Sequence, residues 1–406
     1  MSMWRTVVKV LTAFVERSSG RLVAVLLVTA LGLAAAGLTG PGGHGLAVTS
    51  PWYLWGVNAL LAVGLYGSAS GITRDAVQDV PTVVAAVTVG VALKAALIAV
   101  VMYLASGSTT AMILGVAVAQ IDPLSVSAMI GRSKMSGRAR SLLLAWASFD
   151  DPVTALLTVY LVTTTLSPAA GGSMGGLTSY GTGLAANAAF AAAAGAAWWL
   201  AARRPARRPL KEHPAFPLVA MIVLAGLLAL AAWQFLMLGV ALAGLFYRPR
   251  GVEALVGRVT SVAFYLAAFV LGMLLIGGVD LRLGLILGLA AFGAQVVAGL
   301  LIGRRFGAAD RVRLALGQQN GITAIILALA LQPHLPAAVR VIAPAILTVN
   351  VLHIVTNGVW DRITRPVPVP VPVRTGVRVP SPAPFPAFRP LAVRHVLAMG
   401  SHARKR

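Results

Sequence analysis

Long apolar runs, bounded by charge clusters or by Gly and Pro, recur along this chain of 406 residues. A helix needs about 20 apolar residues to cross a bilayer. Only 11% of the residues are charged, against roughly 25% in soluble domains, so the composition excludes a soluble enzyme or a nucleic-acid-binding module. The chain is therefore predicted to be an all-α polytopic membrane protein. Twelve spans are expected, at roughly 22–39, 52–70, 81–104, 108–130, 141–166, 181–201, 216–231, 233–247, 256–278, 283–303, 311–331 and 338–359.

The basic residues predict the topology. Residues 216–247 form one run that is too long for a straight span, so we divide it near Trp233 into two short helices. With that division, loops on the side of the N-terminus carry 21 Lys and Arg, and the opposite loops carry two, Arg282 and Arg340. Positive charge favours the cytoplasmic side. We therefore expect a multi-pass cell-membrane protein with both termini in the cytoplasm.

The net charge of +22 follows largely from this topology and from the C-terminal tail. We interpret residues 1–21 as a cytoplasmic segment and residues 22–360 as the membrane domain. Residues 361–406 are rich in Pro and basic residues, which is typical of a disordered tail that contacts anionic lipid weakly. The surplus of positive charge therefore does not indicate a nucleic-acid partner.

Four charged residues lie deep inside predicted spans, away from the span ends: Lys94, Asp122, Asp150 and Asp151. A charge in hydrocarbon costs several kcal/mol, so such residues normally face a protein interior and mark an ion or proton route. The structural alternative is a buried ion pair or a helix-capping network. For Lys94 and Asp122 the sequence leaves both interpretations open.

Asp150 and Asp151 are the clearest candidates for an ion site. Neighbouring residues of a helix point about 100° apart, so one carboxylate can line a cavity while the other meets a partner helix. Pro152 cannot donate a backbone hydrogen bond, which frees the carbonyl of Ser148, and Thr154 adds a hydroxyl. Carboxylate, carbonyl and hydroxyl oxygens suit a hard cation or a proton.

Two polar interruptions lie about half the chain apart. Asp122 precedes a proline in the fourth span, and residues 317–323, which include Gln319 and Asn320, interrupt the eleventh. Broken helices at corresponding places in two halves predict inverted repeats, with two crossing discontinuous helices and a site near the middle of the membrane. At such a break Asp122 can offset the positive end of a helix dipole.

Together these motifs resemble the monovalent cation:proton antiporter superfamily. Residues 121–123 resemble its Thr-Asp-Pro crossover, and residues 150–151 resemble the Asp-Asp pair of its electrogenic sodium/proton exchangers. Residues 239–245 and 269–281 resemble its small-residue segment and its glycine-bearing ninth helix, and residues 317–323 sit at the second crossover.

The resemblance covers roughly residues 20–360 and implies roles for the candidate residues. Asp151 would bind the cation and the proton in competition, and Asp150 would be its variable partner. A mobile core would move against a dimerisation scaffold, giving alternating access in a homodimer. The ranges implied are about 81–166 and 283–359 for the core, 22–70 and 216–278 for the scaffold, and 181–201 for a linker helix.

The chain departs from the family pattern at three places. Gln295 stands where electrogenic members carry a lysine that pairs with the first Asp, and Ile121 replaces the crossover threonine. Gln319 and Asn320 stand where many relatives have a charged stretch. Lys94 lies in the third span, which the inverted repeat relates to the tenth. We therefore hypothesise that Lys94 pairs with Asp150 instead.

The function expected from these features is exchange of Na⁺ or K⁺ for protons, without a cofactor. The alternative is a sodium-coupled symporter of an organic anion on the same fold, which the amides at the second crossover would suit. A regulated channel is a further alternative. An intramembrane aspartyl protease needs two aspartates on separate helices that share a water molecule, whereas Asp150 and Asp151 diverge, so we do not expect an enzyme.

Overall fold

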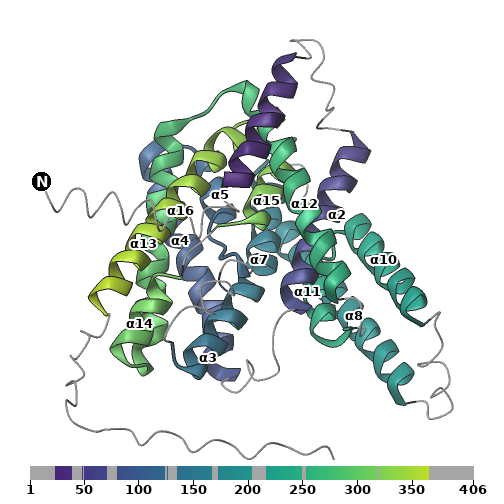
Figure 1. The fold of residues 1–406 in the computed structure, drawn as a ribbon. Coiled ribbons are helices and arrows are strands. Elements are labelled where there is room, and N and C mark those ends of the chain that lie inside the picture. The colour runs from purple at the N-terminus through teal and green to yellow at the C-terminus, as the bar shows by residue number, and fades with distance from the viewer. Residues whose placement is uncertain are drawn as a thin grey trace, which may run out of the picture. The chain divides into compact units, whose positions relative to one another are not determined.

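The computed structural model is helical throughout the part of the chain that it describes, and that part contains no strand (Figure 1). The predicted N-terminal segment, most of the Pro-rich tail and Gln319 lie outside the described residues. The description covers residues 23–38, 48, 50–70, 80–123, 126, 135–166, 172–203, 216–248, 253–317 and 320–364.

The helices fall on the predicted spans, including the interrupted ones. The third span consists of α3, a π-helical segment and α4, and the eleventh is divided between α14 and α15. The bounds, after a first helix at Val23–Leu38, are α2 Pro51–Ser70, α3 Val80–Ala85, the π-helical segment Ala86–Gly90, α4 Val91–Ser106, α5 Thr109–Ala117, α7 Gly137–Leu166, α8 Gly172–Arg203, α10 Phe216–Gln234, α11 Met237–Phe246, α12 Glu253–Leu274, α13 Leu281–Ile302, α14 Ala308–Ala315, α15 Ile322–Leu331 and α16 Ala338–Ile363.

Several helices satisfy the requirements of a membrane span. Five described stretches are both long enough and apolar enough to cross a bilayer, and three shorter apolar helices accompany them. The protein is therefore an all-α polytopic membrane protein. The five stretches are Pro81–Ser106, Gly137–Val162, Leu255–Gly277, Leu281–Arg305 and Ala338–Ile363.

The division of the 216–247 run is confirmed. α10 ends at Gln234 and α11 begins at Met237. The break centres on Phe235, whose φ is 54°, a backbone conformation that a residue with a Cβ rarely adopts and that cannot continue a helix. The break lies two residues after the predicted position at Trp233.

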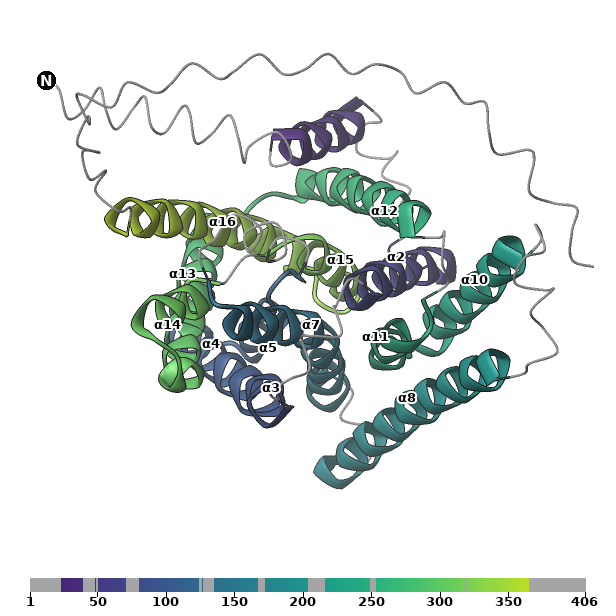
Figure 2. The same ribbon diagram turned by 60° about the horizontal axis from the view of Figure 1, so that its bottom comes forward.

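The membrane helices pack in two neighbouring groups (Figure 2). In one group α13 packs against α16 and α4, and α4 packs against α5. In the other, α2 is surrounded by α10, α11 and α12, and α8 packs on α11. The first group also includes α15, which packs on α16, and α7, which packs on α5. The two groups meet where α15 packs against α2 and α12 and where α7 packs against α11. The division into a mobile core and a scaffold stays a prediction.

Glycines bring α13 and α16 into close contact. A Cβ at Gly284 would overlap the ring of Pro344, and a Cβ at Gly288 would lie 2.6 Å from the Cβ of Thr348. Close approach of this kind is how helices associate in lipid, where dispersion contacts replace the hydrophobic effect. The contact holds α16 against α13.

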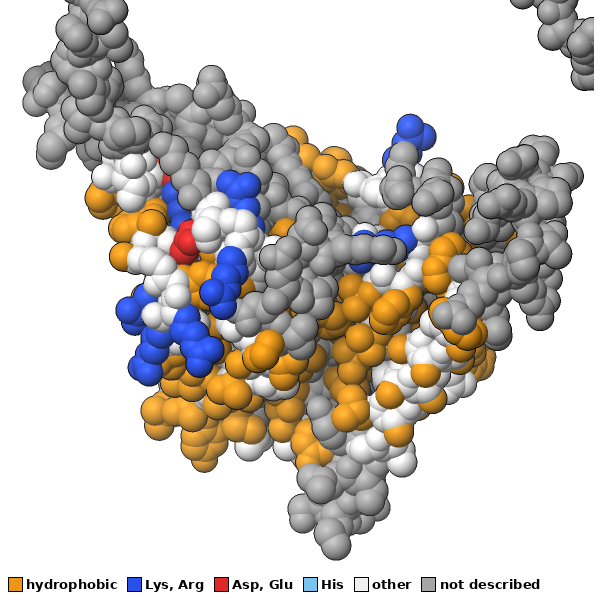
Figure 3. Space-filling model, turned by 90° about the horizontal axis from the view of Figure 1, so that it is seen from below, with side chains coloured by type: hydrophobic (Ala, Val, Ile, Leu, Met, Phe, Trp, Pro, Cys, Tyr) orange, Lys and Arg blue, Asp and Glu red, His pale blue; other side chains and the backbone are white. Residues whose placement is uncertain are grey.

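Basic side chains gather at one end of the molecule. Figure 3 views the end on which α14 lies and shows Lys and Arg side chains among hydrophobic ones. Arg304 and Arg305, in the turn between α13 and α14, are exposed. Their exposure agrees with their predicted place in a loop.

We predict that Gly288→Val forces α13 away from α16. Overpacking of a close contact costs about 1–3 kcal/mol, so the midpoint of thermal unfolding of the purified protein should fall. Gly293→Val is the matched control, because nothing lies within 4 Å of a Cβ at Gly293 in the same helix. Equal midpoints for the two variants would contradict the packing described.

Candidate functional site

The two interruptions of the helices meet each other. α5 ends at Ala117, and helical hydrogen bonding resumes where the N–H of Val126 donates to the carbonyl of Asp122 (3.0 Å). The second interruption ends at Gly321, just before α15. A Cβ placed on Gly321 would overlap the carboxylate of Asp122. The crossing predicted from the sequence is therefore present.

Asp122 lies at the N-terminus of α15. A helix N-terminus carries a partial positive charge, so a carboxylate there is stabilised. The absence of a side chain at Gly321 is what allows the carboxylate to come so close. On the other side of the interruption, the amide of Asn350 in α16 donates to the carbonyl of Asn320 (2.9 Å). Side chains from two distant parts of the chain thus hold the second interruption.

Asp150 and Asp151 are both buried in α7, with 0% and 1% of their surface exposed. They face different partners, as the helix geometry predicts. Asp150 meets α4, and Asp151 faces the first interruption and α15. The hydroxyl of Ser148, one turn before, donates to the carbonyl of Leu144 within the helix (2.8 Å).

Asp150 forms an ion pair with Lys94. The ammonium of Lys94 is fully buried and donates to Oδ2 of Asp150. It also lies 5.3 Å from the ring centroid of Trp146, within the range of a cation–π interaction. The π-helical segment Ala86–Gly90 ends just before this turn, and such segments are frequent at functional sites. The pairing expected for Lys94 is confirmed.

Gln295 occupies the position where the family resemblance led us to expect a lysine paired with Asp150. Gln295 bonds to a different group. Its side chain is buried in α13 and donates to the carbonyl of Leu314 at the end of α14 (3.0 Å). That carbonyl has few partners within its own helix, because the last turn of a helix leaves carbonyls unpaired. Gln295 therefore links α13 to the C-terminal end of α14, the half-helix before the second interruption.

The carboxylate of Asp151 is held on one side. The carboxamide of Gln120, oriented so that both of its ends are satisfied, donates to Oδ1 of Asp151 (3.1 Å) and accepts from the N–H of Ala324 (2.9 Å). The hydroxyl of Thr323 lies beside the same carboxylate, and Asp122 is close enough to repel it. Asp151 thus connects α7, the first interruption and α15.

Several buried oxygens in this region lack hydrogen-bond partners of normal geometry within the described part of the chain. They include Oδ2 of Asp151, the hydroxyl of Thr323 beside it, and the hydroxyl of Thr154 one turn further along α7. Buried polar atoms are rarely left in this state. Carboxylate and hydroxyl oxygens are the ligands that hard cations prefer, and a proton can also satisfy the carboxylate.

Two residues of this site, Gln120 and Thr323, were not among the sequence candidates. The signal for both was present, since each is a polar residue beside an interruption in an apolar span. Asn350 and His353 contact backbone carbonyls: the amide of Asn350 donates to that of Asn320, and His353 Nδ1 lies 3.1 Å from that of Leu316.

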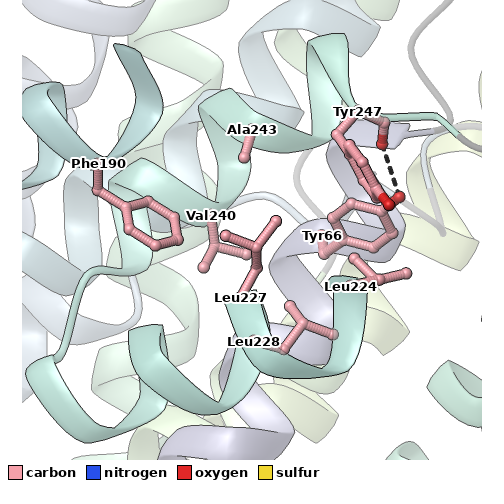
Figure 4. A pocket seen from close by; sticks show the side chains of 8 residues that line it. All are labelled: Tyr66, Phe190, Leu224, Leu227, Leu228, Val240, Ala243 and Tyr247. Atoms are coloured by element: carbon pink, nitrogen blue, oxygen red, sulfur yellow. Dashed lines mark hydrogen bonds between the residues drawn. The ribbon is translucent and has the colours of Figure 1, made fainter. Parts of the chain in front are cut away.

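A separate pocket lies between α2, α8, α10 and α11 (Figure 4). Its lining is aromatic and aliphatic, with Phe190, Tyr66 and Tyr247 around it. The hydroxyl of Tyr66 is occupied, because it donates to the carbonyl of Tyr247 (2.7 Å). The pocket therefore offers no carboxylate to a cation.

We predict that Lys94→Gln and Asp150→Asn each lower the thermal stability of the purified protein. Removing one partner of a buried ion pair leaves an uncompensated charge, at a cost of about 3–5 kcal/mol. The double variant should recover most of this loss, because it removes both charges. Single variants as stable as the unmodified chain would contradict the pairing.

Comparisons with known proteins identify the fold. No protein-family model matches the sequence, and none of the curated proteins does. Two solved structures of the sodium proton antiporter MjNhaP1 from Methanocaldococcus jannaschii are similar to the chain, both at 15% identity and over 89% of its length. The first, at pH 8, is covered completely with a TM-score of 0.62, and the second, from an electron-microscopy map, to 94% with a TM-score of 0.51. The chain therefore has the fold of a sodium proton antiporter, as its sequence motifs indicated.

Proposed function

We propose that this protein exchanges a monovalent cation, Na⁺ or K⁺, for protons, and that both bind at Asp151. The observation that carries the proposal is the buried Oδ2 of Asp151, which has no hydrogen-bond partner of normal geometry in the described residues and lies in a carboxylate beside the hydroxyl of Thr323, at the crossing of two interrupted helices. The fold shared with an antiporter supports the same reading.

Competition follows from the charge of one carboxylate. A bound cation balances the negative charge, and a bound proton removes it, so either ligand makes the buried group stable in a low dielectric. Both cannot use the same oxygen at once. Each passage of the site across the membrane would then carry one ligand or the other, which is the condition for exchange.

Movement of the interrupted helices against their neighbours would give alternating access. α15 starts at the site and packs on α2. A Cβ at Gly64 of α2 would lie 3.9 Å from the methyl group of Thr323. We propose that helices α3–α7 and α13–α16 move as a core, and that the first helix (Val23–Leu38), α2 and α10–α12 form the scaffold of a homodimer.

The orientation proposed for the membrane places both termini in the cytoplasm of a cell membrane. The distribution of 21 basic residues against two supports it. The exposed Arg304 and Arg305 lie in a turn assigned to that side.

The test of the exchange is transport in proteoliposomes with Na⁺, K⁺ and Li⁺ across pH 6–9. We expect Asp151→Asn to abolish exchange, because the amide can neither bind a proton nor balance a cation. Asp310→Asn is the matched control: the carboxylate of Asp310 accepts from the N–H of Ser136 (3.0 Å), and an amide oxygen keeps that bond. Robust exchange by the Asp151 variant would refute the assignment.

Lys94 gives a second prediction, on the charge moved in each cycle. Lys94→Gln removes one positive charge from the site, so the current per transported cation should change. Electrical measurement on the same proteoliposomes checks this against the ion flux. An unchanged ratio would show that Lys94 only stabilises the fold.

A further inference from the structure

We infer that Gln120 is a positioning residue for Asp151, which fixes the carboxylate so that Oδ2 remains available to the cation. The inference rests on the proposed function and deepens it, because it names a determinant of cation affinity at the same site. It depends on the two hydrogen bonds of one buried carboxamide, to Oδ1 of Asp151 and from Ala324.

The place of Gln120 in the fold is well defined. It lies between α5 and Asp122, with 1% of its surface exposed. The next side chain, Ile121, packs into an apolar cluster with Val91 and Trp146. Neighbouring side chains of this segment therefore face different surroundings, and Gln120 is the one that reaches Asp151.

A carboxamide suits this place because it is a donor and an acceptor at once. The N–H of Ala324 belongs to the first turn of α15, where N–H groups have no partner within the helix. The carbonyl end of Gln120 caps that group, and its amino end donates to Asp151. An aliphatic side chain of equal length could do neither.

The orientation of Asp151 has a consequence for ligand binding. A donated hydrogen bond stabilises a charged acceptor more than a neutral one. Gln120 therefore favours the charged carboxylate that a cation requires over the protonated one. It also occupies Oδ1, which leaves Oδ2, an oxygen without a hydrogen-bond partner in the described residues, for the cation.

The variant that tests this role is Gln120→Met, which keeps the length of the side chain and removes the carboxamide. Exchange is measured in proteoliposomes, with whichever of Na⁺ and K⁺ the unmodified protein transports. We expect KM for the cation to rise about tenfold or more, the size expected for losing a hydrogen bond to a charged group. The rise should be larger at acid pH, where the proton competes better, while the maximal rate changes less than about threefold.

Two further variants separate this role from a general loss of structure. Gln120→Asn keeps the carboxamide on a shorter stem, and we expect an intermediate KM. Ile121→Val alters the neighbouring side chain within the apolar cluster, and we expect KM to stay unchanged. Thermal unfolding is measured for all variants, and if Gln120→Met does not fold, the KM of Gln120→Asn decides.

The outcomes distinguish this inference from the function on which it rests. A folded Gln120→Met variant with KM within twofold of the unmodified protein at every pH would overturn the positioning role. If Asp151→Asn is inactive in the same preparation, the exchange function survives that result. If Asp151→Asn still exchanges cations, the proposed binding site itself is wrong.

Discussion

The cost of keeping carboxylates away from water governs this structure. Asp122, Asp150 and Asp151 are buried in an apolar bundle, and each has a specific means of compensation. Asp150 has the ammonium of Lys94, and Asp122 has the N-terminus of α15. Asp151 has a donated hydrogen bond from Gln120, with the hydroxyl of Thr323 beside it, but no ammonium paired with it as Asp150 has. Under the proposed function, a proton or a cation would supply the missing compensation.

The interruptions make this arrangement possible. Their crossing brings Asp122, Gln120 and the first turn of α15 next to α7. Side chains from other helices form hydrogen bonds with the backbone carbonyls at the interruption. Gln295 donates a hydrogen bond to the carbonyl of Leu314, and Asn350 donates one to the carbonyl of Asn320. Irregular backbone of this kind is tolerated at membrane depth where protein surrounds it.

Much of the fold could be predicted from the sequence, because apolar runs determine where helices cross the membrane and charged residues determine where the loops lie. The division of residues 216–247 was expected, and so was the pairing of Lys94 with Asp150, since charges inside spans need partners. The partners of Gln120 and Gln295 were not foreseen. Both bond to backbone groups at the ends of half-helices. Those contacts depend on the path of the backbone through the interruptions, which the apolar pattern does not specify.

The most direct test of the central claim is proton release when a cation binds. Addition of Na⁺ or K⁺ to weakly buffered, detergent-solubilised protein should lower the pH of the solution, because the cation displaces the proton from Asp151. The account predicts this release for the unmodified chain and none for Asp151→Asn. Cation binding that releases no proton, or release that survives in Asp151→Asn, would contradict it.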